Sequence, residues 1–252
     1  MMYSLENKIV LVVGGTSGIG FETVKRFSEE GSIVIMCGRN IDKGNNVVKQ
    51  LQNKEKIDFI KCDIGNKSDI ENLFKIIENK YNRLDVAVNN ASIFCMGKSF
   101  HEYSLEKYNE VINVNLTGTF LCMQKEIKMM INSKKGSIIN IISTAGVGAQ
   151  TYGSAPYIIS KHGEVGLTRV AALEYAEKGI RVNAILPGMT DTELLRQITN
   201  EKMLNEIVER YPMKRLLKPI EIAEAALFLS SDVASGINGL LLTIDQGKST
   251  KT

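Results

Sequence analysis

The chain has 252 residues, of which 44% are apolar and 23% are charged, and its formal net charge is +3. This composition is ordinary for a globular protein, and the length suits one α/β domain spanning residues 1–252. The small net charge, without any block of basic residues, gives no support for nucleic-acid binding.

The four cysteines, Cys37, Cys62, Cys95 and Cys122, are widely spaced, without a C-x-x-C motif or a neighbouring histidine. We therefore expect neither a disulfide framework nor a metal site, and buried thiols suit a reducing compartment. The first apolar run, Ile9–Val13, is too short for a signal sequence or a membrane span. These features predict a cytoplasmic protein without membrane attachment.

The run Ile9–Val13 is continuous and rich in β-branched residues, which predicts a strand buried on both faces of a parallel sheet. Gly14, Gly18 and Gly20 follow it, and helical apolar spacing then continues to Glu30. In this context a glycine loop and a helix N-terminus can bind a pyrophosphate. The spacing is G-x-x-x-G-x-G rather than G-x-G-x-x-G, so a turn in another kind of α/β protein is the alternative.

A second strand is predicted at residues 32–37, and it ends at Gly38 and Arg39. In dinucleotide-binding folds an acidic side chain near this point binds the adenosine ribose, whereas arginine suits a 2′-phosphate. No acidic residue occupies positions 37–39. Arg39 therefore favours NADP(H), with NAD(H) as the second cofactor, and a solvated surface arginine is the alternative.

A third strand is predicted at residues 57–62, directly before Asp63. Asp63 could cap a loop or hold an adenine amino group. A helix is predicted from Ser68 to Tyr81, and Ser68 with Glu71 has the spacing of a capping box.

A fourth strand is predicted at residues 84–88, and it leads into Asn89, Asn90, Ala91 and Ser92. Two amides and two small residues at the carboxyl end of a parallel strand suit a cofactor crevice. A simple turn is the alternative.

Residues 105–131 have the pattern of one long helix, with Asn115 inside it. Asparagine side chains compete for backbone hydrogen bonds, so this position indicates a functional role or a kink, against a plain surface residue. A fifth strand follows at residues 136–142 and ends at Ser143.

Tyr157 and Lys161 lie four residues apart in the next predicted helix, residues 156–178, and therefore share one face. A phenol normally titrates near pH ~10, and a cation held close to it favours the phenolate. The pair could therefore transfer a proton, with Tyr157 as the acid or base and Lys161 tuning it. A packed tyrosine one turn from a solvated lysine is the alternative.

A sixth strand at residues 180–186 ends at Pro187-Gly188, and a last strand is predicted at residues 239–244. Between them, residues 190–212 are polar and contain methionine, which predicts a substrate lid. Strands and helices alternate throughout the chain. This alternation predicts a doubly wound parallel sheet with helices on both faces.

Taken together, the motifs resemble those of the short-chain dehydrogenase/reductase family over nearly the whole chain. The matching residues are Gly14, Gly18, Ile19, Gly20, Asp63, Asn89, Asn90, Ala91, Asn115, Ser143, Tyr157, Lys161, Pro187 and Gly188. The resemblance implies a Rossmann-like sheet of seven strands in the order 3-2-1-4-5-6-7.

The resemblance also implies NAD(P)-dependent oxidation of an alcohol or reduction of a ketone. Tyr157 would be the acid/base at the reacting oxygen, and Ser143 would hydrogen-bond that oxygen. Lys161 would lower the pKa of Tyr157 and bind the nicotinamide ribose, and Asn115 would hold a water that links Lys161 to solvent. The residues expected to bind the cofactor are Gly14, Thr16, Ser17, Gly18, Ile19, Gly20, Arg39, Asp63, Ile64, Asn90, Ala91, Tyr157, Lys161, Pro187, Gly188, Thr190 and Thr192.

Two residues depart from the usual family pattern, because threonine commonly stands where Val13 lies and glycine where Ser92 lies. We hypothesise that Ser92 compensates by bringing a hydroxyl to the turn after the fourth strand. The glycine-rich tail of the family is also changed here, to Asp245-Gln246-Gly247.

The segment 212–219 is similar to that of some bacterial bile-acid hydroxysteroid dehydrogenases, so a cyclic or steroid-like secondary alcohol is the first substrate class. A 3-oxoacyl carrier-protein reductase is the alternative enzyme, although those reductases often carry a basic residue where Leu173 precedes Glu174. A non-catalytic nucleotide-binding regulatory protein is the third possibility, and intact Ser143, Tyr157 and Lys161 argue against it. The resemblance implies a homotetramer or homodimer.

Overall fold

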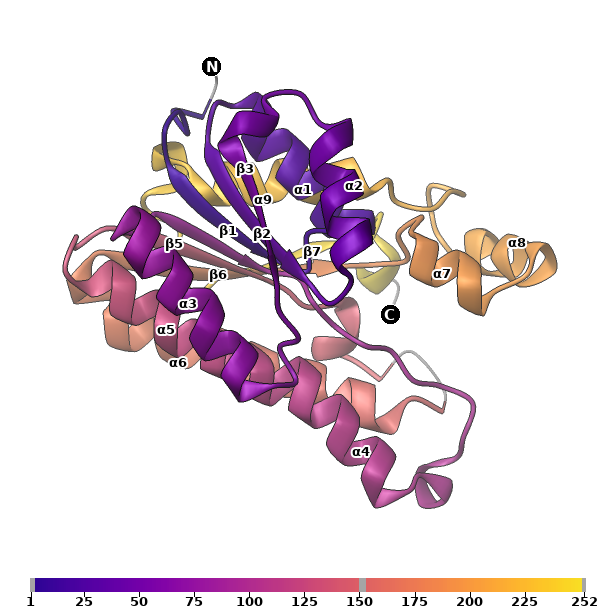
Figure 1. Cartoon of the computed structure of the whole chain (residues 1–252). Helices are drawn as coiled ribbons and strands as arrows, with labels where there is room; N and C mark the ends of the chain where they lie inside the picture. Colours follow the sequence, from indigo (N-terminus) through magenta and orange to yellow (C-terminus); the bar gives the residue numbers. More distant parts are fainter. Residues whose placement is uncertain (1–2, 150–152, 251–252) are drawn as a thin grey trace.

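The computed structural model describes residues 3–149 and 153–250 of the chain. Within these residues seven strands form one parallel sheet in the order β3-β2-β1-β4-β5-β6-β7 (Figure 1). The strands are β1 Ile9–Val13, β2 Ile33–Gly38, β3 Ile57–Lys61, β4 Val86–Asn89, β5 Gly136–Ile141, β6 Ile180–Pro187 and β7 Leu241–Ile244. The predicted fold class and strand order are confirmed.

Helices cover both faces of this sheet (Figure 1). Helices α1, α2 and α9 lie on one face, and α3, α5 and α6 lie on the other. The helices are α1 Gly18–Glu29, α2 Ile41–Gln50, α3 Lys67–Tyr81, α4 Leu105–Ile112, α5 Thr119–Ile131, α6 Ala155–Tyr175, α7 Glu193–Ile198, α8 Glu201–Glu209 and α9 Pro219–Ser230. Among the described helices, none combines the length and the apolar character needed to cross a bilayer.

Strand β1 lies in the middle of the sheet and is buried along its whole length. Its residues alternate between two cores, as side chains on a strand must. Leu11 packs in the cluster that contains Leu73 of α3, whereas Val12 packs in the cluster that contains Phe27 of α1. Two covered faces explain why the sequence of β1 is uniformly apolar.

The long helix predicted from residue 105 to residue 131 is interrupted. Residues Asn113–Gly118 form a π-helical turn between α4 and α5. The Asn115 side chain hydrogen-bonds to the backbone of Ile93. The backbone of Gly118 lies so close to Ile64 that a Cβ added to Gly118 would lie 2.5 Å from the carbonyl oxygen of Ile64. Such turns occur where side chains or close contacts displace the ordinary helical bonding. Asn115 therefore lies in an interruption of regular α-helix, at the position where the sequence indicated a kink or a functional role.

The start of α3 differs from the prediction. The helix begins after Asn66, whose side-chain oxygen accepts a hydrogen bond from the Ser68 backbone N–H at 2.9 Å. Asn66 has the extended backbone and the short amide that suit an N-cap, so the capping box predicted at Ser68 and Glu71 was wrong.

The stretch predicted as a lid contains two short helices, α7 and α8, which stand away from the sheet (orange in Figure 1). Thr192 caps α7 by accepting a hydrogen bond from Leu195 N, and Asn200 caps α8 in the same way from Met203 N. The two capped helices give this stretch a defined structure, and its role as a lid stays a prediction.

Candidate active site

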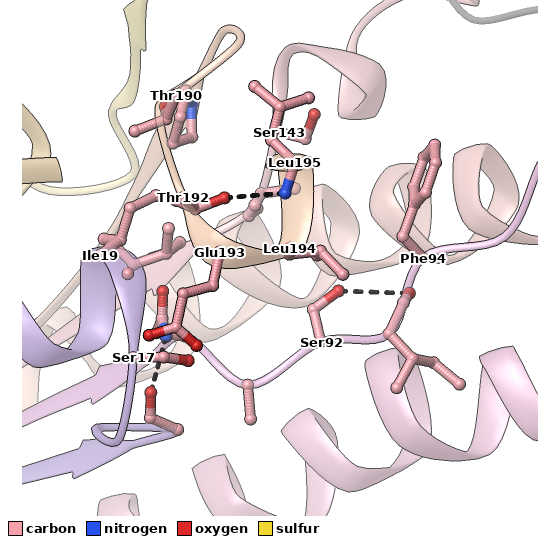
Figure 2. A pocket seen from close by; sticks show the side chains of 18 of the residues that line it. Ser17, Ile19, Ser92, Phe94, Ser143, Thr190, Thr192, Glu193, Leu194 and Leu195 are labelled. Atoms are coloured by element: carbon pink, nitrogen blue, oxygen red, sulfur yellow. Dashed lines mark hydrogen bonds between the residues drawn. The ribbon is translucent and has the colours of Figure 1, made fainter. Parts of the chain in front are cut away.

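The carboxyl ends of the strands open into one cleft of about 400 Å³. Figure 2 shows Ser17 and Ile19 on one side of this cleft and Phe94 on the opposite side. The predicted site residues that line it are Gly14, Thr16, Ser17, Gly18, Ile19, Arg39, Asp63, Ile64, Asn90, Ala91, Ser143, Tyr157, Pro187, Gly188, Thr190 and Thr192. Three others, Gly20, Asn115 and Lys161, lie behind its wall.

The glycine loop is packed so tightly that side chains are excluded. A Cβ on Gly20 would lie 2.0 Å from the carbonyl oxygen of Gly14, and one on Gly14 would lie 2.8 Å from the backbone of Ala91. Gly14 also has a φ of +81°, which favours glycine. The Asn90 side chain donates to the Gly14 carbonyl oxygen at 2.9 Å and joins the loop to the end of β4.

The N-terminus of α1 faces the cleft with its backbone donors free of side-chain caps. Ser17 is the N-cap residue, its side chain makes no capping bond, and the first turn carries no acidic residue. Unpaired N–H groups and the positive end of the helix dipole attract an anion. Together with the glycine loop, this end of the cleft fits the pyrophosphate of a nicotinamide dinucleotide.

The end of the cleft beside β2 and β3 contains Arg39, Asp63 and Ile64. The Asp63 carboxylate accepts a hydrogen bond from Gly65 N at 2.9 Å, so it caps its loop while it lines the cleft. Arg39 is exposed, and no described residue forms an ion pair with it. Its guanidinium is therefore available to a negatively charged group in the cleft.

Tyr157 and Ser143 supply the hydroxyl groups at the other end. The Tyr157 ring meets the Phe94 ring edge to face, with the centroids 4.9 Å apart. The Ser143 oxygen accepts a hydrogen bond from Ala145 N at 3.1 Å. Because that bond uses a lone pair of the oxygen, the Ser143 hydroxyl hydrogen stays available to a bound molecule.

Lys161 lies one turn after Tyr157 on α6, as predicted, and its Nζ is 5.7 Å from the centre of the Tyr157 ring. The lysine is only 1% exposed. Its Nζ donates to both carboxylate oxygens of Glu164, at 2.8 and 3.1 Å. Burial raises the pKa of the Glu164 carboxyl above its usual range, and the Lys161 charge limits that rise.

Asn115 connects the π-helical turn to the same region. Its side chain accepts a hydrogen bond from Ile93 N at 2.8 Å and donates to Ile93 O at 3.0 Å and to Ser160 Oγ at 3.1 Å. Ser160 in turn donates to the carbonyl oxygen of Tyr157 at 2.7 Å. This chain of bonds fixes the start of α6 against the loop after β4.

A second buried polar group lies behind the cleft, on α5. The Glu126 carboxylate accepts a hydrogen bond from Asn89 at 3.1 Å, Asn89 donates to Asn140 at 3.0 Å, and Asn140 donates to Thr168 at 2.9 Å. Burial raises the pKa of Glu126 to about 8, against the opposing effect of the Asn89 hydrogen bond. Glu126 is therefore largely protonated at neutral pH.

Sequence reasoning missed several residues of this region. Glu164 could have been suspected, because a carboxylate three residues after a lysine on a helix lies within reach of it. Phe94 and the apolar residues of α7 have no such signal, because loops and short helices bring them to the cleft only in the folded chain. The apolar lining residues that were not predicted include Ile93, Phe94, Met189, Leu194, Leu195 and Ile198.

The positions of Val13 and Ser92, the two residues that depart from the family pattern, bear on the compensation hypothesis. Val13 pairs with Asn89 in the sheet register, so β1 and β4 are neighbours as the compensation hypothesis requires. The Ser92 hydroxyl points to Ile93 O at 3.5 Å, the outer limit of a hydrogen bond (Figure 2). The contact is weak, and the proposed energetic coupling with Val13 stays a prediction.

The family model described as enoyl-(acyl carrier protein) reductase matches residues 13–249. The chain is 40% identical, over 253 residues, to 2,5-dichloro-2,5-cyclohexadiene-1,4-diol dehydrogenase of Sphingobium indicum, with 98% of each protein covered. The chain belongs to the short-chain dehydrogenase/reductase family. This short-chain dehydrogenase/reductase is also 36% identical, over 271 residues, to 3beta-hydroxysteroid dehydrogenase of Mediterraneibacter gnavus, with 99% of the chain and 98% of the relative covered.

Solved structures agree with this assignment. A 3-ketoacyl-(acyl-carrier-protein) reductase from Brucella melitensis, complexed with NADH, superimposes with a TM-score of 0.90 at 31% identity and covers 98% of this chain and all of its own. A variant actinorhodin polyketide ketoreductase with NADPH gives 0.90 at 32% identity, covering 98% and 99%. The chain is therefore an oxidoreductase acting on CH–OH groups with a nicotinamide cofactor.

Proposed function

We propose that this short-chain dehydrogenase/reductase interconverts a secondary alcohol and a ketone on a cyclic, largely apolar substrate, with NADP(H) as the preferred cofactor. The observation that carries the proposal is the convergence of Tyr157 and Ser143 at one end of a cleft whose other end is a glycine loop at a helix N-terminus. The cofactor supplies or accepts the hydride when bound.

Different residues along the cleft would each hold one part of the cofactor. The N-terminus of α1, from Ser17 to Ile19, would bind the pyrophosphate, and Asp63 with Ile64 would contact the adenine. Arg39 would pair with a 2′-phosphate, which supports NADP(H) over NAD(H). Asn90, Ala91, Pro187, Gly188, Thr190 and Thr192 would surround the nicotinamide end.

The reacting oxygen would lie between the two hydroxyl groups. Ser143 donates a hydrogen bond to it, and Tyr157 takes the alcohol proton during oxidation or gives a proton during reduction. Lys161, behind the cleft wall, would stabilise the phenolate form of Tyr157 through its positive charge. Asn115 holds the loop after β4 against Ser160 and thereby keeps Tyr157 in register, in addition to the water-holding role that the family resemblance implies.

Apolar side chains support a cyclic substrate. Ile93 and Phe94 line the cleft beside Tyr157, and Leu194 and Leu195 of α7 face it from the proposed lid (Figure 2). The two relatives named above act, by their names, on a substituted cyclohexadiene diol and on a steroid. We propose that residues 190–212 close over such a ring.

The alternative reaction is reduction of 3-oxoacyl groups on a carrier protein, as the name of the Brucella melitensis structure states for that enzyme. Such a protein substrate carries acidic charge, which basic residues attract. Here Leu173, which is 82% exposed, stands where those reductases often carry a basic residue before Glu174. The absence of a basic residue at that position supports the cyclic small-molecule substrate over the carrier protein.

The outer face of α6 supports self-association. Ile159, Val170 and Leu173 lie on the outside of α6, and Phe120 of α5 is also exposed. Gly166 lies between them with open space around it, which lets another helix approach closely. We propose that this surface pairs copies of the chain in a homodimer or homotetramer.

The buried free cysteines suit the reducing compartment predicted for the protein.

Replacement of Tyr157 by phenylalanine tests the function. The wild type should oxidise or reduce members of a panel of cyclic alcohols and ketones, followed by cofactor absorbance at equal concentrations of NADPH and NADH. The Tyr157→Phe variant should bind cofactor normally and lose turnover by ~10²–10⁴-fold, the usual contribution of general acid–base catalysis. A variant that keeps wild-type kcat would remove Tyr157 from the mechanism.

A further inference from the structure

The buried ion pair behind the cleft points to a function for Glu164. Lys161 is 1% exposed and Glu164 is 3% exposed, so neither charge has contact with bulk water. Nζ of Lys161 donates to Oε1 at 2.8 Å and to Oε2 at 3.1 Å. A lysine ammonium has three N–H donors. Two of them are directed to Glu164, which leaves one for Tyr157 or the cofactor.

The Glu164 carboxylate has no other partner among the described residues, since Thr168 bonds to the Glu164 carbonyl oxygen and not to its side chain. A buried carboxylate is unfavourable unless it is paired. The neighbouring buried glutamate, Glu126, is bonded to an amide and to no lysine. The side chain at position 164 therefore acts on Lys161 alone.

We propose that Glu164 is a positioning residue, whose carboxylate holds the ammonium of Lys161 beneath Tyr157 and keeps it charged during turnover. The inference rests on the proposed function, in which Lys161 acts on Tyr157. An ammonium withdrawn from water tends to lose its proton when no anion pairs with it. Glu164 prevents that loss and sets the distance of Nζ from the Tyr157 ring, 5.7 Å from its centre.

Few other charges reach this pair. Tyr157 is the ionisable group on the same face of α6, one turn earlier. The π-helical turn and residues 144–146 pack against α6 and contain no ionisable side chain. From β6, Arg181 donates to the carbonyl oxygens of Leu229 and Ser231, at the edge of the sheet away from the cleft.

Helix α4 also packs against α6. Its Lys107 and Glu110 pair with each other at 2.7 Å at the surface, and Glu106 is exposed. Tyr108 is half-buried. Among the hydrogen bonds of the described residues, Glu126 connects to α6 through the amides of Asn89 and Asn140, which lead to Thr168. Within the described residues, Glu164 is therefore the anion that compensates Lys161.

The variant Glu164→Gln keeps the shape of the side chain and removes its charge. Glu126→Gln is the matched control, because it makes the same change at another buried glutamate that lacks a lysine partner. Circular dichroism would establish that both variants fold. Glu164→Asp retains the charge on a shorter side chain and should restore part of the wild-type behaviour, and it also serves if the amide variant does not fold.

The first readout needs no activity. Lysine labelled with 13C at Cε would be followed by NMR against pH, with Lys161→Arg used to identify the Lys161 signal. In Glu164→Gln the signal should change to that of the neutral amine at least about one pH unit lower than in the wild type. In Glu126→Gln it should follow the wild type. An unchanged signal in Glu164→Gln would overturn the proposal.

The second readout is kcat/KM for alcohol oxidation from about pH 6 to about pH 10. The ratio of wild type to Glu164→Gln should grow with pH and reach tenfold or more at the alkaline end, because the variant lysine loses its charge there. A merely structural defect would lower activity equally at every pH, and that constant ratio would also overturn the proposal. If the wild type turned over no alcohol or ketone, the proposed function would fail while the NMR result still decided the role of Glu164.

Discussion

The buried glutamate of α5 gives a stability prediction that is independent of substrate. Glu126 is 0% exposed, and its Oε1 and the Oδ1 of Asn89 have no hydrogen-bond partner among the described residues. Both atoms are acceptors while Glu126 is ionised. A proton on Oε1 would make that atom a hydrogen-bond donor and remove the buried charge. Glu126→Gln supplies a donor and an acceptor at every pH, so it mimics the protonated acid.

The direction in which stability changes with pH follows from the pKa values of Glu126 in the folded and unfolded states. In the folded protein burial raises the pKa of Glu126 from 4.5 to about 8, so between these values the folded state holds a proton that the unfolded state has released. Stability from this group is fully present below pH ~4.5 and is lost as pH rises through ~8. At about 1.4 kcal/mol per pH unit, the loss is of the order of 5 kcal/mol.

Urea unfolding of wild type and Glu126→Gln, at one protein concentration and at several pH values from about 5 to 9, measures this effect. The free energy of unfolding of the variant, relative to that of the wild type, should rise by about 1.4 kcal/mol per pH unit over much of this range. Glu110→Gln is the control, because Glu110 lies at the surface and its replacement should give a nearly flat difference. A flat difference for Glu126→Gln would show that the buried carboxyl does not hold its proton.

Three further outcomes are expected. Arg39→Ala should weaken NADPH binding about tenfold to a hundredfold and leave NADH binding nearly unchanged, as measured by fluorescence titration, and an equal loss for both cofactors would refute the 2′-phosphate contact. Gly20→Ala should lose cofactor binding and at least ~1–3 kcal/mol of stability, because its Cβ would lie 2.0 Å from Gly14 O, and a variant with normal Tm would contradict this close packing. Val13→Thr should soften the effect of Ser92→Gly if the two residues compensate, and additive effects on stability and cofactor affinity in a double-mutant cycle would reject the coupling.

Local patterns in the sequence, together with the family resemblance, were enough to predict the sheet and most of the cleft. The glycines after β1 and the polar residues after β3, β4 and β5 are visible because each follows an apolar run. Parallel strands carry their carboxyl ends to one edge, so residues far apart in the chain were correctly expected to meet there. The pairing of Tyr157 with Lys161 could be predicted equally well, because helical spacing alone places them on one face.

Hydrogen bonds across the fold decided what such patterns left open. The interruption at Asn113–Gly118 follows from contacts of Asn115 with Ile93 and from the close approach of Gly118 to Ile64, both distant in sequence. The start of α3 was decided locally instead, by the Asn66 side chain that caps the helix two residues before Ser68, and the spacing of Ser68 and Glu71 did not reveal it. A helix period identifies the face that packs, but the partners on the other side are chosen by the whole chain.

Burial marks the clearest division between the two kinds of information. The sequence by itself determined the alternation of strands and helices, the glycine loop and the pairing of Tyr157 with Lys161, because these depend on residue type and spacing, and the family resemblance implied the strand order and the role of Ser143. Only the tertiary structure decided that Lys161 lies behind the cleft wall against Glu164 and that Glu126 is enclosed beside Asn89. The energy of a charged side chain depends on the water and partners around it, and those are known only when the chain has folded.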